Sequence, residues 1–313
     1  MEATTKVICT KFISVTFSLT FLLATASTAR AALTGKFIHA TMTWDGITRY
    51  YLVYVPLNLP PNPALVMMLH GTSFSTTPPT TKNWGWWTLA DTYHFIEVQP
   101  AATLNTASGA WNWNAYFLDA AFQKSPGPDD SGFLRQLITN LTARYALNPK
   151  QIYVAGFSSG AEMAQRVGVD ISDLVAAIIP ASGQISAVPA LPIVLPGPPA
   201  APVSVQEWHG TLDTVLPPCN NGTTQYSGHT FYLSTVGQSF NYWTRQNACT
   251  VFTTSKPLCL NGVANPAVTG NHATGCADPH VDVQFIWEKG VKHSWVYSNL
   301  PARWRFFASH PKP

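Results

Sequence analysis

The sequence predicts an α/β fold in which helices cover both faces of a mostly parallel sheet. Residues 64–69 and 151–155 are short, uninterrupted apolar runs, which are typical of strands buried inside a sheet. Residues 131–145 carry one apolar stripe at helical spacing, and this helix lies just before the second strand. An alternation of strand, helix and strand is typical of parallel neighbours, so these segments predict the fold class.

Further elements follow the same alternation. Residues 48–55 are aromatic-rich and partly alternating, which predicts an early antiparallel strand. The helix at 131–145 begins with acidic and serine caps and stops at Asn148-Pro149. Six prolines make residues 187–202 an irregular surface loop. The remaining predicted elements are strands at 95–99, 175–180, 204–208 and 281–287, and a short closing helix at 301–310.

The strand at 151–155 leads directly into the pentapeptide Gly-Phe-Ser-Ser-Gly, which has Ser158 at its centre. A helix that begins at Ala161 would complete a strand, sharp turn and helix in which the serine oxygen projects clear of the backbone. This arrangement is the nucleophile elbow of an α/β-hydrolase. An ordinary Gly/Ser turn is the alternative, and the strand and helix on either side favour the elbow.

Three post-strand loops supply the partners that such a serine requires. After the strand at 64–69, the backbone N–H of Thr72 is expected to form an oxyanion hole with the N–H of Ser159; a plain turn is the alternative. Asp213 and His293 follow two later strands and complete the chain order Ser, Asp, His of this fold. The competing residues, which are placed less well, are Asp173, Asp278, Asp282, His209, His272 and His280. His209 precedes a glycine, which suggests a role in a turn.

Tryptophans gather in two segments between the predicted strands. A flat apolar ring with one donor suits either a core or a site that stacks against sugar or phenyl rings. For residues 84–87 both interpretations are open, and Trp86 is included among the candidate substrate-binding residues. Trp111 and Trp113 stand beside Gly, Asn and Ser, which favours a cleft wall for Trp111.

The first 31 residues are expected to be a secretory signal. A weakly basic start is followed by an uncharged apolar core at 12–26 and by small residues up to Ala31. A membrane anchor is the alternative, but the apolar core is shorter than the ~20 residues that span a bilayer. We therefore expect a secreted, extracellular chain with no membrane contact after signal removal, in which residues 32–313 form a single catalytic domain.

Composition restricts the partners. Charged residues make up 11% of the chain against ~25% in an average protein, and the net charge is +3. Nothing here suggests a nucleic-acid surface, and a neutral polymer or uncharged ester suits such a surface better. We expect a monomer that acts on a polymeric or small ester.

Four of the five cysteines lie beyond the expected signal, namely Cys219, Cys249, Cys259 and Cys276. An even number in an exported chain favours two disulfides, with three pairings possible. A metal site is the alternative, but no C-x-x-C or closely spaced His/Cys cluster supports it. Asn140 and Asn221 begin Asn-x-Thr glycosylation sequons.

Together these motifs resemble those of secreted esterases that include polyhydroxybutyrate depolymerase-like enzymes, feruloyl esterases and acetylxylan esterases of carbohydrate esterase family one. The resemblance extends from about Arg49 to Trp295 and is carried by motifs in a shared order. These are Tyr-Val-Pro at 54–56, Leu-His-Gly at 69–71, Trp-Asn-Trp at 111–113, Asp-Ser-Gly-Phe at 130–133, the elbow at 153–160, Trp-His-Gly-Thr-Leu-Asp at 208–213, residues 243–249, and His-Ser-Trp at 293–295.

The resemblance implies Ser158, Asp213 and His293 as the catalytic triad. It also implies disulfides from Cys249 to Cys276 and from Cys219 to Cys259. Two positions depart from the pattern: Ala110 stands where many relatives have a disulfide-forming cysteine, and Glu162 stands where a small or apolar residue is usual.

The expected chemistry is two-step acyl transfer, for which no metal or organic cofactor is needed. The expected substrates are feruloyl or acetyl esters of plant cell-wall xylan. A polyhydroxybutyrate depolymerase is the alternative within the same chemistry. A non-catalytic exported binding protein on a hydrolase scaffold is the alternative of another class.

Overall fold

The computed structural model describes residues 34–106, 108–115, 127–186, 195–220, 222–226 and 229–312, with backbone only for 222–226 and 229–233. The expected signal segment, residues 1–31, lies outside these ranges, as do Asn221 and part of the proline-rich loop. Asn140 lies inside them and is exposed on a helix.

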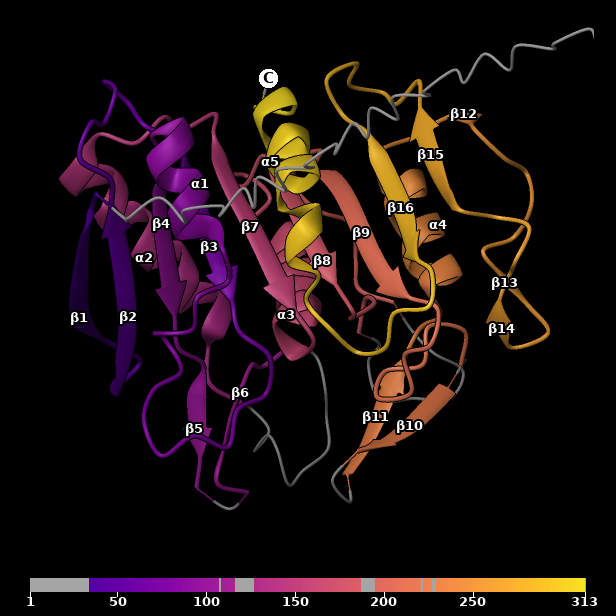
Figure 1. Cartoon of the computed structure of the whole chain (residues 1–313), viewed down its shortest axis with the longest axis horizontal. Helices are drawn as coiled ribbons and strands as arrows, with labels where there is room; N and C mark the ends of the chain where they lie inside the picture. Colours follow the sequence, from indigo (N-terminus) through magenta and orange to yellow (C-terminus); the bar gives the residue numbers. More distant parts are fainter. Residues whose placement is uncertain are drawn as a thin grey trace, which may run out of the picture. The chain divides into compact units, whose positions relative to one another are not determined.

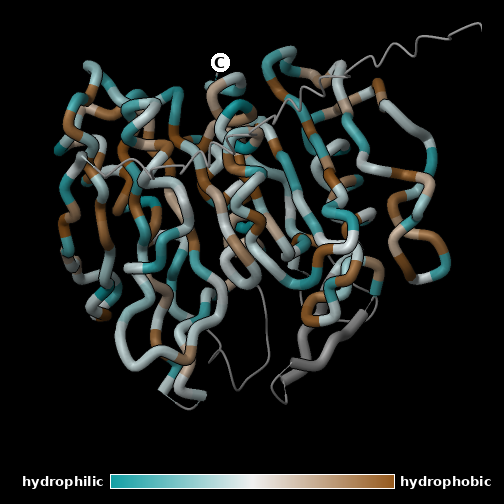
Figure 2. The backbone as a smooth tube through the Cα atoms, viewed as in Figure 1, coloured by the Kyte–Doolittle hydropathy of each residue, from teal (hydrophilic) through white to brown (hydrophobic). Residues whose placement is uncertain are grey.

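The architecture is built on a ten-stranded sheet with the order β1-β2-β4-β3-β7-β8-β9-β16-β15-β12 (Figure 1). The six strands from β4 to β16 in this order are mutually parallel, and the two at either edge are antiparallel. The parallel strands are β3 (Leu65–Leu69), β4 (Ile96–Pro100), β7 (Ile152–Phe157), β8 (Ala177–Ala181), β9 (Ser204–Gly210) and β16 (Val283–Glu288). The sheet is thus mostly parallel, as the apolar runs predict, and hydrophobic residues recur along its strands (Figure 2).

The helices lie on both faces of this sheet. α2 (Asp130–Tyr145), α3 (Ser159–Asp170) and α4 (Val236–Gln246) contribute to one hydrophobic cluster, and α1 (Trp86–Tyr93) and α5 (Leu300–Ser309) contribute to the other (Figure 1). Alternate residues of the central strands supply the two clusters, because successive side chains of a strand point to opposite faces. No helix within the described ranges is both long and apolar enough to span a membrane.

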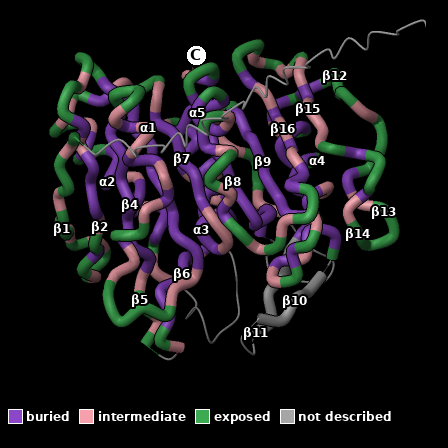
Figure 3. The backbone as a smooth tube through the Cα atoms, in the orientation of Figure 1, coloured by how far each residue is buried: buried purple, intermediate pink, exposed green. Residues whose placement is uncertain are grey.

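The antiparallel edge contains a strand that the sequence interpretation missed. β1 (Lys36–Trp44) pairs with β2 (Ile47–Val55) along its full length, through a two-residue turn at Asp45 and Gly46. Both turn residues have positive φ, as an Asp-Gly hairpin turn requires. β1 alternates between exposed and half-buried positions, so it lacks the continuous apolar run that identifies the central strands (Figure 3).

The opposite edge of the sheet and the segments around it also differ from the prediction. α4 and the short strands β12 (Val251–Phe252), β13 (Cys259–Leu260), β14 (Val263–Ala264) and β15 (Gly270–Thr274) were not predicted. Two disulfides join this region, Cys219 to Cys259 and Cys249 to Cys276, and this is the pairing that the resemblance implies. The remaining described elements are β5 (Thr103–Asn105), β6 (Ala110–Asn112), β10 (Gly222–Tyr226), β11 (His229–Leu233) and a turn of 3₁₀ helix at Tyr297–Asn299.

A buried ion pair connects strand β2 to helix α2. Nη2 of Arg49 lies 2.6 Å from Oδ1 of Asp130, and the two side chains are 1% and 0% exposed. The other oxygen of Asp130 accepts the backbone N–H of Asn114 at 2.7 Å, and the guanidinium lies over the ring of Phe133. Burial raises the pKa of Asp130, although Arg49 acts in the opposite direction. The charge on this carboxylate therefore depends on its partner.

Replacing Asp130 by Asn is expected to lower the free energy of unfolding by ~3 kcal/mol, because it leaves the Arg49 guanidinium buried without a counter-charge. Urea denaturation of the two proteins measures this loss. Asp129→Asn is the matched control: Asp129 is the exposed N-cap of α2, and asparagine keeps the capping oxygen, so that change should cost less than ~0.5 kcal/mol. Equal losses in the two variants would contradict the role of the buried pair.

Candidate active site

The turn between β7 and α3 holds Ser158 in a strained conformation. Its φ is 56° and its ψ is −126°, values that a non-glycine residue rarely adopts. The flanking glycines are required by close approach: a Cβ on Gly160 would lie 2.2 Å from the carbonyl oxygen of Leu69, and one on Gly156 would lie 2.0 Å from that of Gly160. The predicted strand, turn and helix are therefore present, with α3 beginning at Ser159 rather than at Ala161.

Ser158, His293 and Asp213 form one hydrogen-bonded chain. Nε2 of His293 lies 2.9 Å from Oγ of Ser158, and its Nδ1 lies 2.7 Å from Oδ2 of Asp213. Because a carboxylate oxygen faces Nδ1, that nitrogen carries the proton and Nε2 is free to accept one from the serine. These three residues come from the ends of β7, β9 and β16, which the parallel sheet brings to one edge.

The carboxylate of Asp213 is fixed from several directions. Its Oδ1 accepts the backbone N–H groups of Val215 and Leu216, each at 2.9 Å. Its Oδ2 lies 3.2 Å from Nε2 of His209 in addition to its contact with His293. Burial alone would raise the pKa of Asp213, but the hydrogen bonds from His209 and His293 outweigh burial and hold the pKa well below its ordinary value. The group is thus held as an anion.

His209 has a role that the sequence interpretation missed. The glycine that follows it predicts a turn, yet His209 is a fully buried residue of β9. Both oxygens near its Nε2, those of Asp213 at 3.2 Å and of the Leu216 carbonyl at 3.0 Å, are acceptors, so this nitrogen donates. Its spacing of four from Asp213 was visible in the sequence, but the bend that brings the two side chains together was not.

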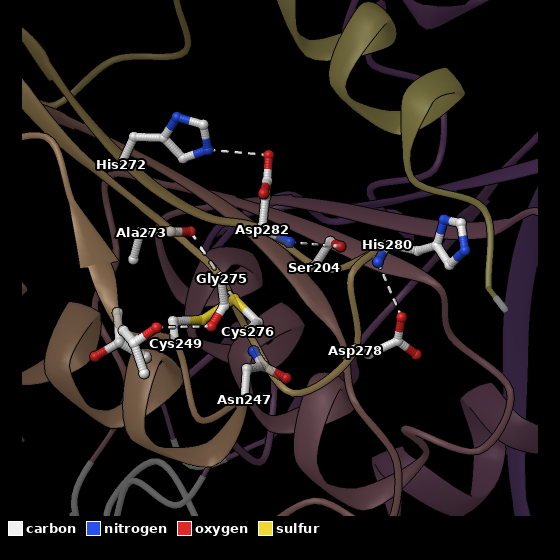
Figure 4. Close-up of a disulfide and its surroundings, with 12 residues drawn as sticks. Ser204, Asn247, Cys249, His272, Ala273, Gly275, Cys276, Asp278, His280 and Asp282 are labelled. Carbon is white, nitrogen blue, oxygen red and sulfur yellow. Dashed lines mark hydrogen bonds and ion pairs between the residues drawn. A yellow bond between two sulfur atoms is a disulfide. The ribbon is translucent and has the colours of Figure 1, made fainter.

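Apart from His209, the competing acids and histidines lie elsewhere and have other partners. Asp173 pairs with Arg135 at 2.6 Å. Around the Cys249–Cys276 disulfide, His272 contacts Asp282 at 2.9 Å, and Asp278 accepts the backbone N–H of His280 (Figure 4). Within the ranges that the structure describes, no three His, Cys, Asp or Glu side chains form a group that could hold a metal ion.

The two predicted oxyanion donors lie beside the serine. Ser159 is the first residue of α3, and Gly71, next to Thr72, is close enough that a Cβ there would lie 3.0 Å from Cβ of Ser158. Neither the Thr72 nor the Ser159 backbone N–H donates to another protein oxygen within the described part of the chain. The hydroxyl of Thr72 donates to Oδ1 of Asn112 at 2.9 Å, which holds the loop in place.

The ring of His70 holds this loop through hydrogen bonds to two backbone groups. Its Nε2 accepts the backbone N–H of Ala102 at 3.0 Å, so its Nδ1 carries the proton and donates to the carbonyl of Gly71 at 2.6 Å. Burial lowers the pKa of His70 to about 4, so the ring is neutral. The N–H of Trp113 donates to the carbonyl of His70, and Trp113 is fully buried.

The prediction that Trp86 and Trp113 contact substrate is wrong. Both are fully buried: Trp86 stacks on Phe307 in the core beneath α5, and Trp113 packs against His70. Tryptophan in a Gly- and Asn-rich segment satisfies the core and cleft interpretations equally, and only burial separates them. Trp111 is 7% exposed and donates its N–H to the carbonyl of Ser75, so its place in a cleft wall stays a prediction.

The two departures from the family pattern are accommodated. Ala110 begins β6, and the loop that a disulfide braces in relatives is held here by backbone hydrogen bonds between Trp111 and Ser73 at 2.8 and 3.1 Å. Glu162 is 2% exposed, and burial raises its pKa well above the ordinary value, which favours the protonated carboxyl. Neither residue displaces the Ser158 hydrogen-bond chain.

No protein-family model matches the chain. It is 28% identical over 247 residues to a bifunctional acetylxylan esterase/xylanase of Neocallimastix patriciarum, covering 78% of this chain and 33% of that protein. It is 32% identical over 144 residues to feruloyl esterase B of Piromyces equi, covering 45% and 24%. It is 26% identical over 195 residues to poly(3-hydroxyalkanoate) depolymerase C of Paucimonas lemoignei, covering 55% and 45%. The chain spans less than half the length of each of these three relatives. All three are of the kinds of esterase and depolymerase that the sequence resembles, so the resemblance is confirmed.

The fold agrees with these relatives. The acetyl xylan esterase from Aspergillus awamori superposes with a TM-score of 0.60 at 19% identity, covering 88% of this chain and 100% of that one. At this identity the likeness concerns the fold. The mostly parallel sheet with helices on both faces is the α/β-hydrolase fold, as predicted.

Replacing His209 by Leu is expected to lower kcat/KM on an ester about tenfold, because Asp213 loses a charge-assisted donor. The acid limb of the pH–activity profile should also move to higher pH, since fewer donors stabilise the Asp213 anion. His209→Gln keeps an N–H donor and should recover most of the activity. A profile that is the same in the wild type and both variants would contradict the positioning role.

The free energy of unfolding should fall as the pH drops from 6.5 to 4, because the unfolded chain protonates the imidazole of His70 in this window and the folded chain does not. The total contribution is ~3 kcal/mol. Denaturant unfolding at several pH values measures the slope in the wild type and in His70→Gln, which cannot titrate. The slope, not the absolute stability, is compared, and identical slopes would rule out His70 as its source.

Proposed function

We propose that this protein is a serine hydrolase of carboxylic esters. The observation that carries the proposal is the continuous hydrogen-bond chain from Ser158 through His293 to Asp213 at a strained elbow. A nucleophile with a base in reach, and that base oriented by an acid, is the arrangement of covalent acyl transfer. The sequence relatives, all named as esterases or depolymerases, support it.

In the first step His293 accepts the Ser158 proton on Nε2 while Oγ attacks the ester carbonyl carbon. The oxyanion that forms is stabilised by the N–H groups of Thr72 and Ser159. Collapse of the tetrahedral species breaks the bond to the alkoxy oxygen, which takes the proton from His293 and leaves as the alcohol. Asp213, held as an anion, stabilises the imidazolium that exists between the two proton transfers.

In the second step a water molecule replaces the alcohol. His293 removes a proton from the water as it attacks the acyl carbon, and the same two N–H groups stabilise the second tetrahedral species. Its collapse breaks the bond to Oγ, which recovers the proton from His293. The products are a free acid and the restored serine, so no metal or organic cofactor takes part.

For the substrate we propose feruloyl or acetyl esters of plant cell-wall xylan. The relatives that carry this name include the acetylxylan esterase/xylanase that aligns with 78% of the chain. Low overall charge also suits a neutral polymer. A hydroxyalkanoate polyester is the second candidate, because a depolymerase of such polyesters aligns with 55% of the chain.

We further propose that the chain is secreted and acts as a monomer. Two disulfides suit an oxidising, extracellular compartment. The exposed Asn140 on α2 is sterically available for glycosylation. The rival interpretation, a non-catalytic binding protein, is disfavoured because all three members of the hydrogen-bond chain are present and aligned.

Ser158→Ala is expected to lower kcat by 10⁴-fold or more, to roughly the level of catalysis without a nucleophile. Product release from methyl ferulate, acetylated xylan and a polyhydroxybutyrate suspension measures this loss and identifies the preferred substrate. Ser159→Ala is the matched comparison: it removes a hydroxyl but keeps the backbone N–H, so the loss should stay below ~10-fold.

A fluorophosphonate probe supplies an independent readout of the nucleophile. Labelling of the wild type but not of Ser158→Ala is the expected result. Equal activity in the wild type and Ser158→Ala would overturn the assignment of the nucleophile. Absence of both labelling and turnover would favour the non-catalytic alternative.

A further inference from the structure

A hollow lies apart from the serine, between the β1–β2 edge and the loop that follows β3. It encloses about 440 Å³. Its hydroxyl-bearing lining consists of Thr41, Tyr50, Tyr51, Thr77, Thr80 and Thr81. We refer to it as the threonine groove. Ser158, His293 and Asp213 do not line the groove. The proposed reaction therefore assigns the groove no role.

The threonine groove opens at the same edge of the sheet as Ser158. Tyr51 in β2 pairs with Pro100, the last residue of β4, and Ser158 likewise follows the last residue of β7. The order β2-β4-β3-β7 places three strand spacings between the two sites. At about 5 Å per spacing the separation across the sheet is ~15 Å, the span of a few sugar units rather than of one small ester.

One continuous loop connects the two sites. It begins at Thr72, which carries one proposed oxyanion donor, and reaches the groove at Thr77. Trp111 holds the loop midway: its backbone pairs with Ser73, and its indole N–H donates to the carbonyl of Ser75 at 2.9 Å. The ring of Trp111 also contacts the ring of Tyr50 edge-on, with centroids 6.2 Å apart. The groove wall and the oxyanion loop are therefore one braced unit.

The lining is chemically suited to a neutral, hydroxyl-rich ligand. The lining includes the imidazole of His39 but no carboxylate, ammonium or guanidinium group. Threonine hydroxyls both donate and accept hydrogen bonds, and Tyr50, which is 38% exposed, presents an aromatic ring beside them. An anionic polymer would find no lysine or arginine in this lining.

We propose that the threonine groove binds the backbone of an extended neutral polysaccharide while an ester on that same chain reaches Ser158. The inference rests on the proposed function, which it deepens by placing the polymer on the molecule. A polyester is a weaker fit, because it offers only acceptors and apolar groups to a lining that also accepts hydrogen bonds. The groove distinguishes polymeric from small substrates and leaves the chemical steps at Ser158 unaltered.

Binding is tested first, separately from catalysis. In the Ser158→Ala background, affinity electrophoresis in gels that contain xylan should show retarded migration. Adding Tyr50→Ala, which removes the ring, or Thr41→Arg, which obstructs the groove without touching Trp111, should weaken the retardation about five- to tenfold. Tyr93→Ala is the matched control, since this exposed tyrosine lies on α1 before the start of β4 and is remote from the groove.

Catalysis is tested with the same changes in the active protein. On acetylated xylan kcat/KM should fall about five- to tenfold through KM in both groove variants, whereas on 4-nitrophenyl acetate Thr41→Arg, which leaves Trp111 untouched, should match Tyr93→Ala. Unchanged xylan retardation in both groove variants would overturn the proposal, as would adsorption to polyhydroxybutyrate that depends on the groove while xylan binding does not. Groove-dependent xylan binding without turnover of any ester would instead contradict the proposed function and leave the groove assignment standing.

Discussion

The close approach of the elbow helix to the end of β3 is the constraint on which the site depends. Gly160 lies against the backbone carbonyls of Leu69 and His70 with no room for a side chain. Because α3 begins at this contact, Ser159 and the loop that carries Thr72 both lie beside Ser158. The strained φ of the serine is maintained by this packing and not by local preference.

A second consequence of the parallel sheet is that the acid and the base are positioned independently of the elbow. Asp213 is held by two backbone N–H groups and by His209, so its orientation does not rely on His293. An anion fixed in this way can orient an imidazole without reorganising during the reaction, which is the condition for electrostatic stabilisation of a transient imidazolium. The buried, neutral His70 performs the corresponding task for the oxyanion loop.

The threonine groove extends this organisation beyond the chemical centre. The loop after β3 carries the proposed oxyanion donor at one end and forms a groove wall at the other, and Trp111 braces its middle. A polymer that binds in the groove would therefore engage the same rigid segment that stabilises the reacting carbonyl. Binding energy gained far from the ester is then available for orienting it.

The sequence by itself determined the central strands, the elbow and the order Ser158, Asp213, His293, because uninterrupted apolar runs and loops that follow strands are local signals. It did not determine which tryptophans are buried. The sequence neighbours of Trp86 and Trp113 are equally compatible with a cleft wall, and only packing against Phe307 and His70 shows that the two side chains lie in the core. Strand β1 was missed because its residues are only half-buried and lack a continuous apolar run. Helix α4 was missed although it carries local signals, namely the capping box of Thr235 and Gln238 and the apolar stripe of Val236, Phe240 and Trp243. The partnership of His209 with Asp213 and the threonine groove likewise exist only once strands far apart in the chain lie side by side, since a hydrogen bond or a hollow is a property of relative position and not of residue type.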